Sequence, residues 1–367
     1  MRVAIAVVLA VHGVIHFMGF AKAFGYASLP QLTQPISRGV GAVWLISGIL
    51  ILISAALLVA SARYRWMAGV AGLIISQAVI MSAWRDAWAG TIPNVVLLLA
   101  VTHGWLTEGP WSFRAQFDRD IAHGLARPME APTITESDLA PLPAPVQRYL
   151  RATGFIGQPR TRNYRLRFRG RIRSAPDNAW MPFDADQQSF ADEPTRLFLM
   201  RARMFGLPVE AFHRFVDGRA TMQVKALGTV PMVDASGPVM DQSETVTVFN
   251  DMCLLAPGTL LDSRIEWEAI DSLSARARFT NGARTITATL LFDDEGLLTN
   301  FVSDDRSRLS SDGKSFAQHR FSTPVRNYRA FGAVRLPGHG DARYLLPEGE
   351  FTYGEFDLQD VAYNVRP

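Results

Sequence analysis

Long runs of apolar residues with almost no charge dominate the first third of the chain. Residues 39–62 contain no charged side chain, and three further apolar runs cover residues 3–24, 66–84 and 92–105. A helix needs roughly 20 apolar residues to cross the hydrocarbon core of a bilayer, where water cannot satisfy backbone polar groups. The pattern therefore predicts a bundle of four membrane-spanning helices over residues 1–107.

The ends of these four runs differ in their content of basic residues. If the N-terminus is cytoplasmic, the inner ends carry five basic residues and the outer ends carry three. Because cytoplasmic loops are enriched in Lys and Arg, this bias favours a cytoplasmic N-terminus. An even number of spans then predicts a multi-pass inner-membrane protein whose following domain is cytoplasmic.

Two histidines interrupt the first apolar run. His12 and His16 are four residues apart and so share one face of a helix. They could hold a haem or a metal ion, since histidine is the commonest metal ligand, or they could form hydrogen bonds between helices. No second histidine pair occurs in the other runs, so we predict hydrogen bonding, with no metal and no cofactor.

Residues 108–145 connect the bundle to the remainder of the chain. Apolar residues recur every four positions from Phe113 to Leu125, which predicts an amphipathic helix. That helix could lie in the membrane interface or pack on the domain that follows, and the sequence does not choose between them. Five prolines in residues 127–145 predict an extended, semi-rigid spacer.

Residues 146–367 change from helical to alternating periodicity. Alternation on both sides of Asn281-Gly282 and of Asp217-Gly218 predicts two tight hairpins. Consecutive hairpins form an antiparallel meander with one buried face. We therefore predict an α+β domain with an antiparallel curved sheet or half-barrel.

One helix is expected among these strands. Asp241 and Glu244 have the spacing of a capping box before residues 245–255, and Pro257-Gly258 ends the helix. Such a helix could be a lid over an apolar cavity or the ordinary cover of an open sheet. As candidates for contact with a hydrophobic ligand we predict Phe198, Met200, Phe212, Met222, Phe249 and Trp267.

One predicted strand carries an unusual row of arginines. Alternation places five of them on one face, where they repel one another unless acids or anions lie opposite. Their partners could be acids such as Asp184 and Asp186 on a neighbouring strand, or the head groups of anionic lipid. The predicted anion-binding residues are Arg165, Arg167, Arg169, Arg171 and Arg173.

The sequence contains no familiar catalytic motif. Phosphate loops, dinucleotide fingerprints, nucleophile elbows and zinc patterns are absent. Five carboxylates could converge with His213 in a cavity, but we assign no catalytic residue: Asp234, Glu244, Asp251, Asp304 and Asp305. Residues 108–367 carry more acidic than basic residues, which argues against nucleic acid as a partner. The single cysteine, Cys253, excludes an intrachain disulfide.

Several segments resemble a known group of proteins. Residues 12–16, 31–38, 250–260 and 353–356 are similar to an uncharacterised family of bacterial membrane proteins, in which a domain of unknown function follows four N-terminal helices. The order of strands, helix and further strands also resembles the half-barrel of lipoprotein carriers, as a fold analogy. That resemblance implies a curved sheet and no particular activity.

Together these patterns support one main functional hypothesis and two alternatives. The main hypothesis is a membrane-anchored module that binds an anionic lipid or another hydrophobic small molecule at the membrane surface. The first alternative is a hydrolase-like enzyme acting on a membrane-derived substrate. The second is a haem, redox or transport role within the helical bundle.

Overall fold

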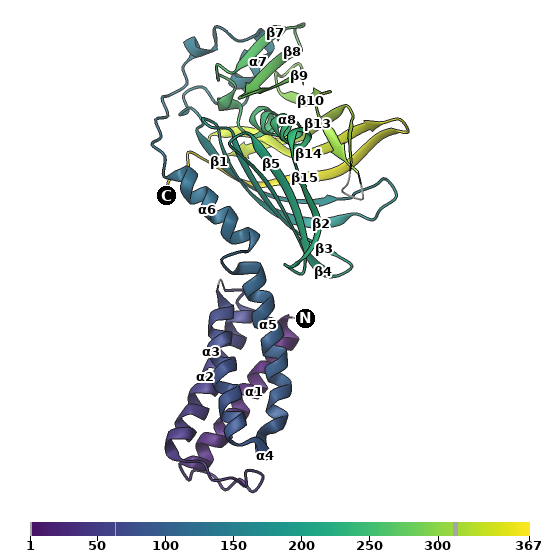
Figure 1. Cartoon of the computed structure of the whole chain (residues 1–367). Coiled ribbons are helices and arrows are strands. Elements are labelled where there is room, and N and C mark those ends of the chain that lie inside the picture. The colour runs from purple at the N-terminus through teal and green to yellow at the C-terminus, as the bar shows by residue number, and fades with distance from the viewer. Residues whose placement is uncertain (1, 63, 311–314) are drawn as a thin grey trace. The chain divides into compact units, whose positions relative to one another are not determined.

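The structure of the protein is a computed structural model that describes residues 2–62, 64–310 and 315–367 (Figure 1). The chain divides into two compact units, Met1–Gln116 and Phe117–Pro367. The division falls inside the segment predicted to connect them, at residues 108–145. Each unit has its own apolar core and is described by itself.

The first unit is a bundle of apolar helices. Four helical stretches are long and apolar enough to cross a membrane, as the sequence predicts. In a helix each apolar run satisfies its backbone polar groups internally, as a segment in hydrocarbon would require. The helices of this unit are α1 (Arg2–Ala23), α2 (Arg38–Val59), α3 (Arg65–Ser82), α4 (Trp84–Ala87), the 3-10 helix Trp88–Gly90 and α5 (Thr91–Glu108).

A buried polar network joins three of these helices. The His12 Nε2 atom lies 3.0 Å from Asn94 Oδ1, and the Ser76 hydroxyl lies 2.9 Å from His16 Nε2. The His16 Nδ1 atom bonds the His12 carbonyl at 3.0 Å, and Asn94 donates to Gln77 at 3.0 Å. Both histidines therefore form the hydrogen bonds between helices that were one of the two interpretations of this pair, the other being a metal or haem site. Among the described residues no group of three or more His, Cys, Asp or Glu side chains could hold a metal ion.

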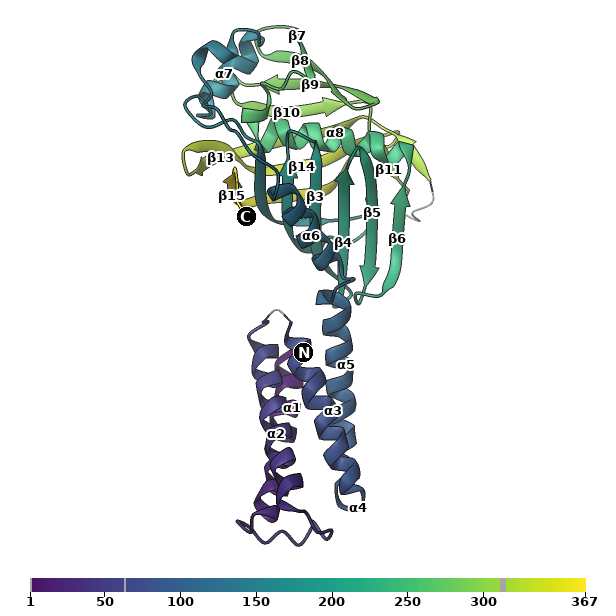
Figure 2. The same cartoon turned by 60° about the vertical axis from the view of Figure 1, so that its left-hand side comes forward.

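The second unit is a large antiparallel sheet that curves around one helix (Figure 2). The described residues form 15 strands, whose bounds are given below. Thirteen of them form one sheet in the order β6-β5-β4-β3-β2-β1-β15-β14-β13-β10-β9-β8-β7, and β11 and β12 form a separate ribbon. The two edge strands, β6 and β7, do not pair with each other, so the sheet is open. The predicted curved antiparallel sheet is confirmed.

The strands and the remaining helices have the following bounds: α6 (Phe113–Leu125), 3-10 helix (Glu136–Leu139), α7 (Ala144–Ala152), β1 (Asn163–Ile172), β2 (Met181–Phe190), β3 (Thr195–Met204), β4 (Leu207–Val216), β5 (Arg219–Ala226), β6 (Val230–Ser236), α8 (Pro238–Leu255), 3-10 helix (Pro257–Thr259), β7 (Ile265–Ala269), β8 (Ser274–Asn281), β9 (Arg284–Phe292), β10 (Leu298–Ser303), β11 (Ser307–Leu309), β12 (Phe316–Gln318), β13 (Phe321–Phe331), β14 (Val334–Leu346) and β15 (Gly349–Tyr363).

The two predicted hairpins are present. Asp217 and Gly218 both have positive φ, 52° and 70°, as a two-residue type I′ turn requires. In the other hairpin Asn281 pairs with Arg284, so the turn comprises residues 282–283, one residue later than predicted. Gly282 has φ 60°, which suits the first turn position of a type II′ hairpin.

The long helix α8 begins earlier than its predicted start at residue 245. Pro238 occupies its first turn and Gly237 is the N-cap, with φ 102°. The predicted capping box at Asp241 is wrong, because the sheet supplies other partners for this carboxylate. It accepts from the Ala220 amide at 2.6 Å and pairs with Arg284 at 2.5 Å.

The connecting segment packs on the second unit. Within that unit the Phe117 and Phe212 rings are 6.1 Å apart, and Asp120 pairs with Arg214 at 2.6 Å. These contacts correspond to the alternative in which the amphipathic helix packs on the domain that follows it. The proline-rich part is not the extended spacer that the sequence predicts, because it contains the 3-10 helix Glu136–Leu139 and the start of α7. The buried Ile134 and Leu139 fix it to the core.

Candidate functional site

A cavity of about 480 Å³ lies between the concave face of the sheet and α8. Met240, Glu244 and Thr247 lie on the helical face that lines it. The opposite face carries Phe249 and Cys253, which are 0% exposed and packed into the core. The helix therefore lies between the cavity and the core, which explains why nearly all of its residues are buried, the polar ones included.

The cavity wall is largely apolar. On β3 the alternate residues Phe198, Met200 and Ala202 face the cavity, because successive side chains of a strand point to opposite faces. Methionine is unusually common in this wall, and its flexible thioether side chain adapts to irregular shapes. The lining methionines are Met181, Met200, Met204, Met222, Met232 and Met240.

The six predicted ligand contacts fall in different places. Phe198, Met200 and Met222 line the cavity. Phe212 lies on the other face of β4 against α6, because it alternates with cavity-lining Ala211 and His213. Phe249 lies on the core face of α8, stacked on Phe279 at 5.1 Å. Trp267 lies on the edge strand β7, against the core cluster.

A buried ionic cluster forms part of the cavity wall. The Arg196 Nε atom lies 2.7 Å from Asp251 Oδ2, and its Nη1 atom lies 3.4 Å from Glu244 Oε2. His213 Nδ1 is 3.5 Å from Glu244 Oε1, and Gln187 donates to Asp251 at 2.8 Å. The Arg196 and Glu244 side chains are only 10% and 2% exposed. We call Arg196, Glu244, Asp251 and His213 the ionic cluster.

The charges of this cluster decide the protonation of Glu244. Burial alone would raise the pKa of this carboxyl group, but the His213 hydrogen bond and the Arg196 charge outweigh burial and lower the pKa to about 2. Glu244 is therefore ionised at neutral pH. An ionised carboxylate with such a low pKa is poorly suited to act as a general acid.

The lowered pKa of Glu244 makes the stability of the second unit depend on pH. Since the folded-state pKa of about 2 lies below the ordinary value of 4.5, its contribution is fully present above pH 4.5. We expect the free energy of unfolding to fall as the pH drops from 4.5 towards 2. Hydrogen exchange of α8 amides in the full chain would measure this loss, and Glu244→Gln should reduce the slope. If the unfolding free energy of Glu244→Gln depended on pH as steeply as that of the unchanged protein, Glu244 would not be the group responsible.

Arg306 lies in the same cavity wall. It donates to the Tyr353 hydroxyl at 2.7 Å, and its guanidinium group is 4.1 Å from the centre of the Phe321 ring and 5.5 Å from that of Tyr344. Burial lowers the pKa of Arg306, but the neighbouring tyrosines and Glu244 outweigh this and raise it. The aromatic rings thus hold a permanent cation at the cavity.

The arginine-bearing strand is β1, and its arginine face meets carboxylates on both sides. Arg171 forms a bidentate pair with Glu355 at 2.7 and 2.8 Å, and Arg169 pairs with Asp184 at 3.3 Å. Arg167 lies opposite acids on both neighbouring strands. This arrangement corresponds to the alternative in which acids of adjacent strands neutralise the row. The predicted residues Arg165 and Arg173 lie at its two ends.

The other predicted carboxylates are not gathered at the cavity. Asp304 pairs with Arg320 at 2.8 Å, and Asp305 accepts from the Thr287 amide at 2.6 Å. His213 and Asp251 do meet in the ionic cluster. The structure therefore brings together three of the acid–base candidates, His213, Glu244 and Asp251, around Arg196.

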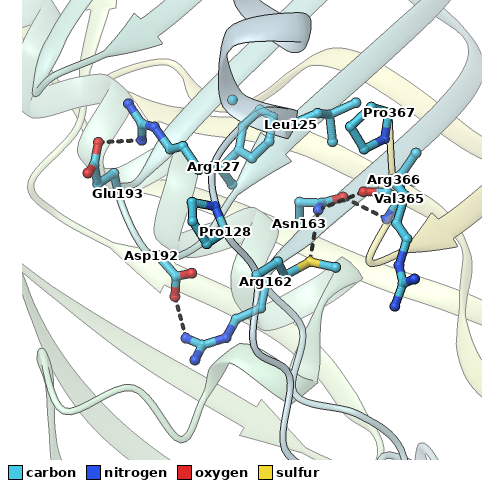
Figure 3. A pocket seen from close by; sticks show the side chains of 13 residues that line it. Leu125, Arg127, Pro128, Arg162, Asn163, Asp192, Glu193, Val365, Arg366 and Pro367 are labelled. Carbon is cyan, nitrogen blue, oxygen red and sulfur yellow. Dashed lines mark hydrogen bonds and ion pairs between the residues drawn. The ribbon is translucent and has the colours of Figure 1, made fainter.

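A second, smaller pocket of about 210 Å³ lies beside the end of β15 (Figure 3). Its charged groups pair with one another: Arg127 with Glu193, and Arg162 with Asp192. Asn163 is held by the Val365 carbonyl at 3.1 Å. Because these polar groups already have partners, this pocket offers fewer contacts to a ligand than the larger cavity.

Sequence reasoning missed Arg196 and Arg306 as cavity residues, whereas Glu244 was among the carboxylates expected to meet His213. One sequence feature does indicate Arg196. Alternation places it on the same face of β3 as Phe198 and Met200, and a charge on an apolar face requires a buried partner. Arg306 lies in the short connection between β10 and β11, so no periodicity indicates which way it points.

A family model, described as a family of unknown function (DUF6544), matches residues 132–356. The chain belongs to the DUF6544 family. The predicted membership of an uncharacterised family is confirmed, and the DUF6544 region includes α8 and the whole ionic cluster. No curated protein matches the sequence.

Two solved structures are similar to the chain at low sequence identity. One is described as an outer membrane lipoprotein-sorting protein domain from Vibrio parahaemolyticus, with 10% identity and a TM-score of 0.31, covering 55% of this chain and 86% of that one. The other is a DUF1329 family protein from Desulfovibrio piger, with 11% identity and a TM-score of 0.34, covering 61% and 94%.

Proposed function

We propose that the second unit binds one hydrophobic or amphipathic molecule, a lipid or a compound like it, in the cavity between the sheet and α8. The observation that carries this proposal is the cavity itself, of about 480 Å³ with a mainly apolar wall. Sites for small molecules are usually concave, mostly apolar and about 300–1,000 Å³ in volume, with a few polar groups. The apolar helices of the first unit would hold the domain at the membrane that supplies the ligand.

The ionic cluster supports binding more than hydrolysis. Arg196 and its two carboxylate partners already satisfy one another. Glu244 has a low pKa and so would not exchange protons near neutral pH. Arg306, held by aromatic rings at the cavity wall, is available to the polar end of an amphipathic ligand.

Photolabelling of the full chain would test this proposal. We would purify the protein in nanodiscs that contain a diazirine fatty acid and map the labelled peptides. We expect label on β3, β5 and α8. The variant Met200→Trp should fill the cavity and remove most of this label, whereas Leu345→Trp, at an exposed site on β14 outside the cavity, should not. Undiminished labelling of α8 in Met200→Trp would contradict the proposal.

A further inference from the structure

Three hairpin connections meet at one end of the curved sheet. Ile172 pairs with Met181, Met204 with Leu207, and Ala226 with Val230. The connections are adjacent, since the Leu227 amide bonds the Pro208 carbonyl at 2.9 Å. We call the exposed apolar side chains at this end the rim, which consists of Phe205, Leu207, Leu227, Val230 and Met232.

The rim gathers five exposed apolar side chains at one end of the sheet. Phe205 is 96% exposed, and the other four side chains are 40–53% exposed. Contiguous apolar patches on a soluble surface usually mark an interaction site. The cores of both units are elsewhere, so the exposure of these side chains does not serve the packing of the fold.

The turn at the tip of the rim has an unexpected sequence. Phe205 and Gly206 have φ 50° and 80°, which defines a type I′ hairpin turn. Such turns favour Asn-Gly, because a bulky residue with positive φ is disfavoured. A phenylalanine there is both exposed to water and in an unfavourable backbone conformation, which indicates a partner outside the domain.

The rim lies beside the mouth of the cavity. Met232 lines the cavity and is also 45% exposed, so the cavity opens at this end. Ile172, Met181 and Met204, which end or begin strands here, line the cavity too. A partner that covers the rim would therefore meet the opening through which a ligand passes.

Two arginines stand at the same mouth. Arg173 donates to the Thr352 carbonyl at 3.0 Å, and Arg308 donates to the Ser174 carbonyl at 2.8 Å. Both also lie over the Phe351 ring, at 5.4 and 5.1 Å. Within the described part of the chain neither forms an ion pair with a carboxylate, so their positive charges are available to anionic groups outside the domain.

The path of the chain leads to the same end. Phe117 lies against Phe212 and Asp120 against Arg214, so α6 follows β4 in the direction in which β4 runs. The chain therefore enters the second unit from the end where β4 begins, beside Leu207.

From these observations we propose that the rim inserts into the interfacial layer of a lipid bilayer, so that the cavity opens directly onto lipid. Apolar side chains that enter the interface, with basic residues beside them, are the usual composition of a membrane-contact surface. This inference concerns how the domain meets the membrane and does not depend on the ligand that the cavity binds.

Site-directed spin labelling of the full chain in nanodiscs of phosphatidylcholine and phosphatidylglycerol would test the inference. Single labels would replace Phe205, Leu227 or, as control, the exposed Ile270 at the β7–β8 turn. The native Cys253 is buried, and burial raises the pKa of its thiol, so the reagent should not modify it. We expect the rim labels to be accessible to oxygen and shielded from an aqueous nickel chelate, and the control label to show the reverse.

Two other outcomes would overturn the inference. Rim labels as accessible to the nickel chelate as the control would show that the rim stays in water. Rim labels shielded from both oxygen and nickel would show that a protein surface, such as a second copy, covers them.

As a second readout, Phe205→Asp with Leu227→Asp should slow photolabelling of α8 from the bilayer roughly tenfold, the order of change in an equilibrium constant for 1.4 kcal/mol. An unchanged rate would also contradict rim insertion.

Discussion

Replacing Arg196 with Met should lower the free energy of unfolding of the second unit by about 3–5 kcal/mol, the usual cost of breaking a buried ion pair. The variant would leave Glu244 and Asp251 buried without their shared cation. His213 can compensate in part, because it lies 3.5 Å from Glu244. Hydrogen exchange of the α8 amides in the full chain would measure the loss.

A matched variant separates the lost ion pair from lost packing. Arg196→Met combined with Glu244→Gln and Asp251→Asn removes all three charges and keeps similar side-chain volumes. We expect it to be more stable than Arg196→Met alone, because neutral amides are less costly to bury than unpaired carboxylates. If Arg196→Met alone changed stability by less than about 1 kcal/mol, the cluster would be behaving as a solvated surface pair.

Phe249→Ala should destabilise the second unit by about 3–5 kcal/mol, as large-to-small changes in a close-packed core do. Its ring is 0% exposed, stacks on Phe279 at 5.1 Å and meets the edge of Phe301 at 5.9 Å. Chemical denaturation of the full chain, followed by proteolysis of the second unit, would report the change.

Met222→Ala is the matched control for Phe249→Ala. Met222 is only partly buried and borders space that is already open in the cavity, so its truncation should cost less stability. Met222→Ala should instead alter photolabelling by the fatty acid. Phe249→Ala should change this labelling only to the extent that it unfolds the second unit. The opposite pattern would mean that the ligand contacts the core face of α8.

The sequence predicts those parts of the fold that depend on local physics. Long apolar runs identify the four candidate spans, because a bilayer imposes a length and excludes charge. The turn at Asp217-Gly218 is predictable because few residue pairs accept two positive φ angles. The start of α8 is not predictable in this way. Asp241 could cap a helix that begins near residue 245, but in the structure its carboxylate binds groups of the sheet instead.

The site depends on contacts that are distant in the sequence. Alternation correctly places Met200 and Met222 facing inward, but it cannot say that Phe249 faces the core while Glu244 faces the cavity. That distinction depends on where the apolar strands β8–β10 pack against α8. The ionic cluster likewise joins β3 to α8 and becomes visible only once both elements are placed.

The pairing of β1 with β15 has a consequence for how the domain is made. The sheet consists of two meanders of local hairpins, and its centre is the seam where its first strand meets its last. During synthesis β1 therefore presents an unpaired edge until β15 leaves the ribosome, and such edges are prone to pair with other chains. Pairing β1 with β15 brings together strands separated by nearly the whole length of the domain, and such distant contacts slow folding. Shortening the chain by one C-terminal strand would thus expose the middle of the sheet, where an aggregating chain could attach.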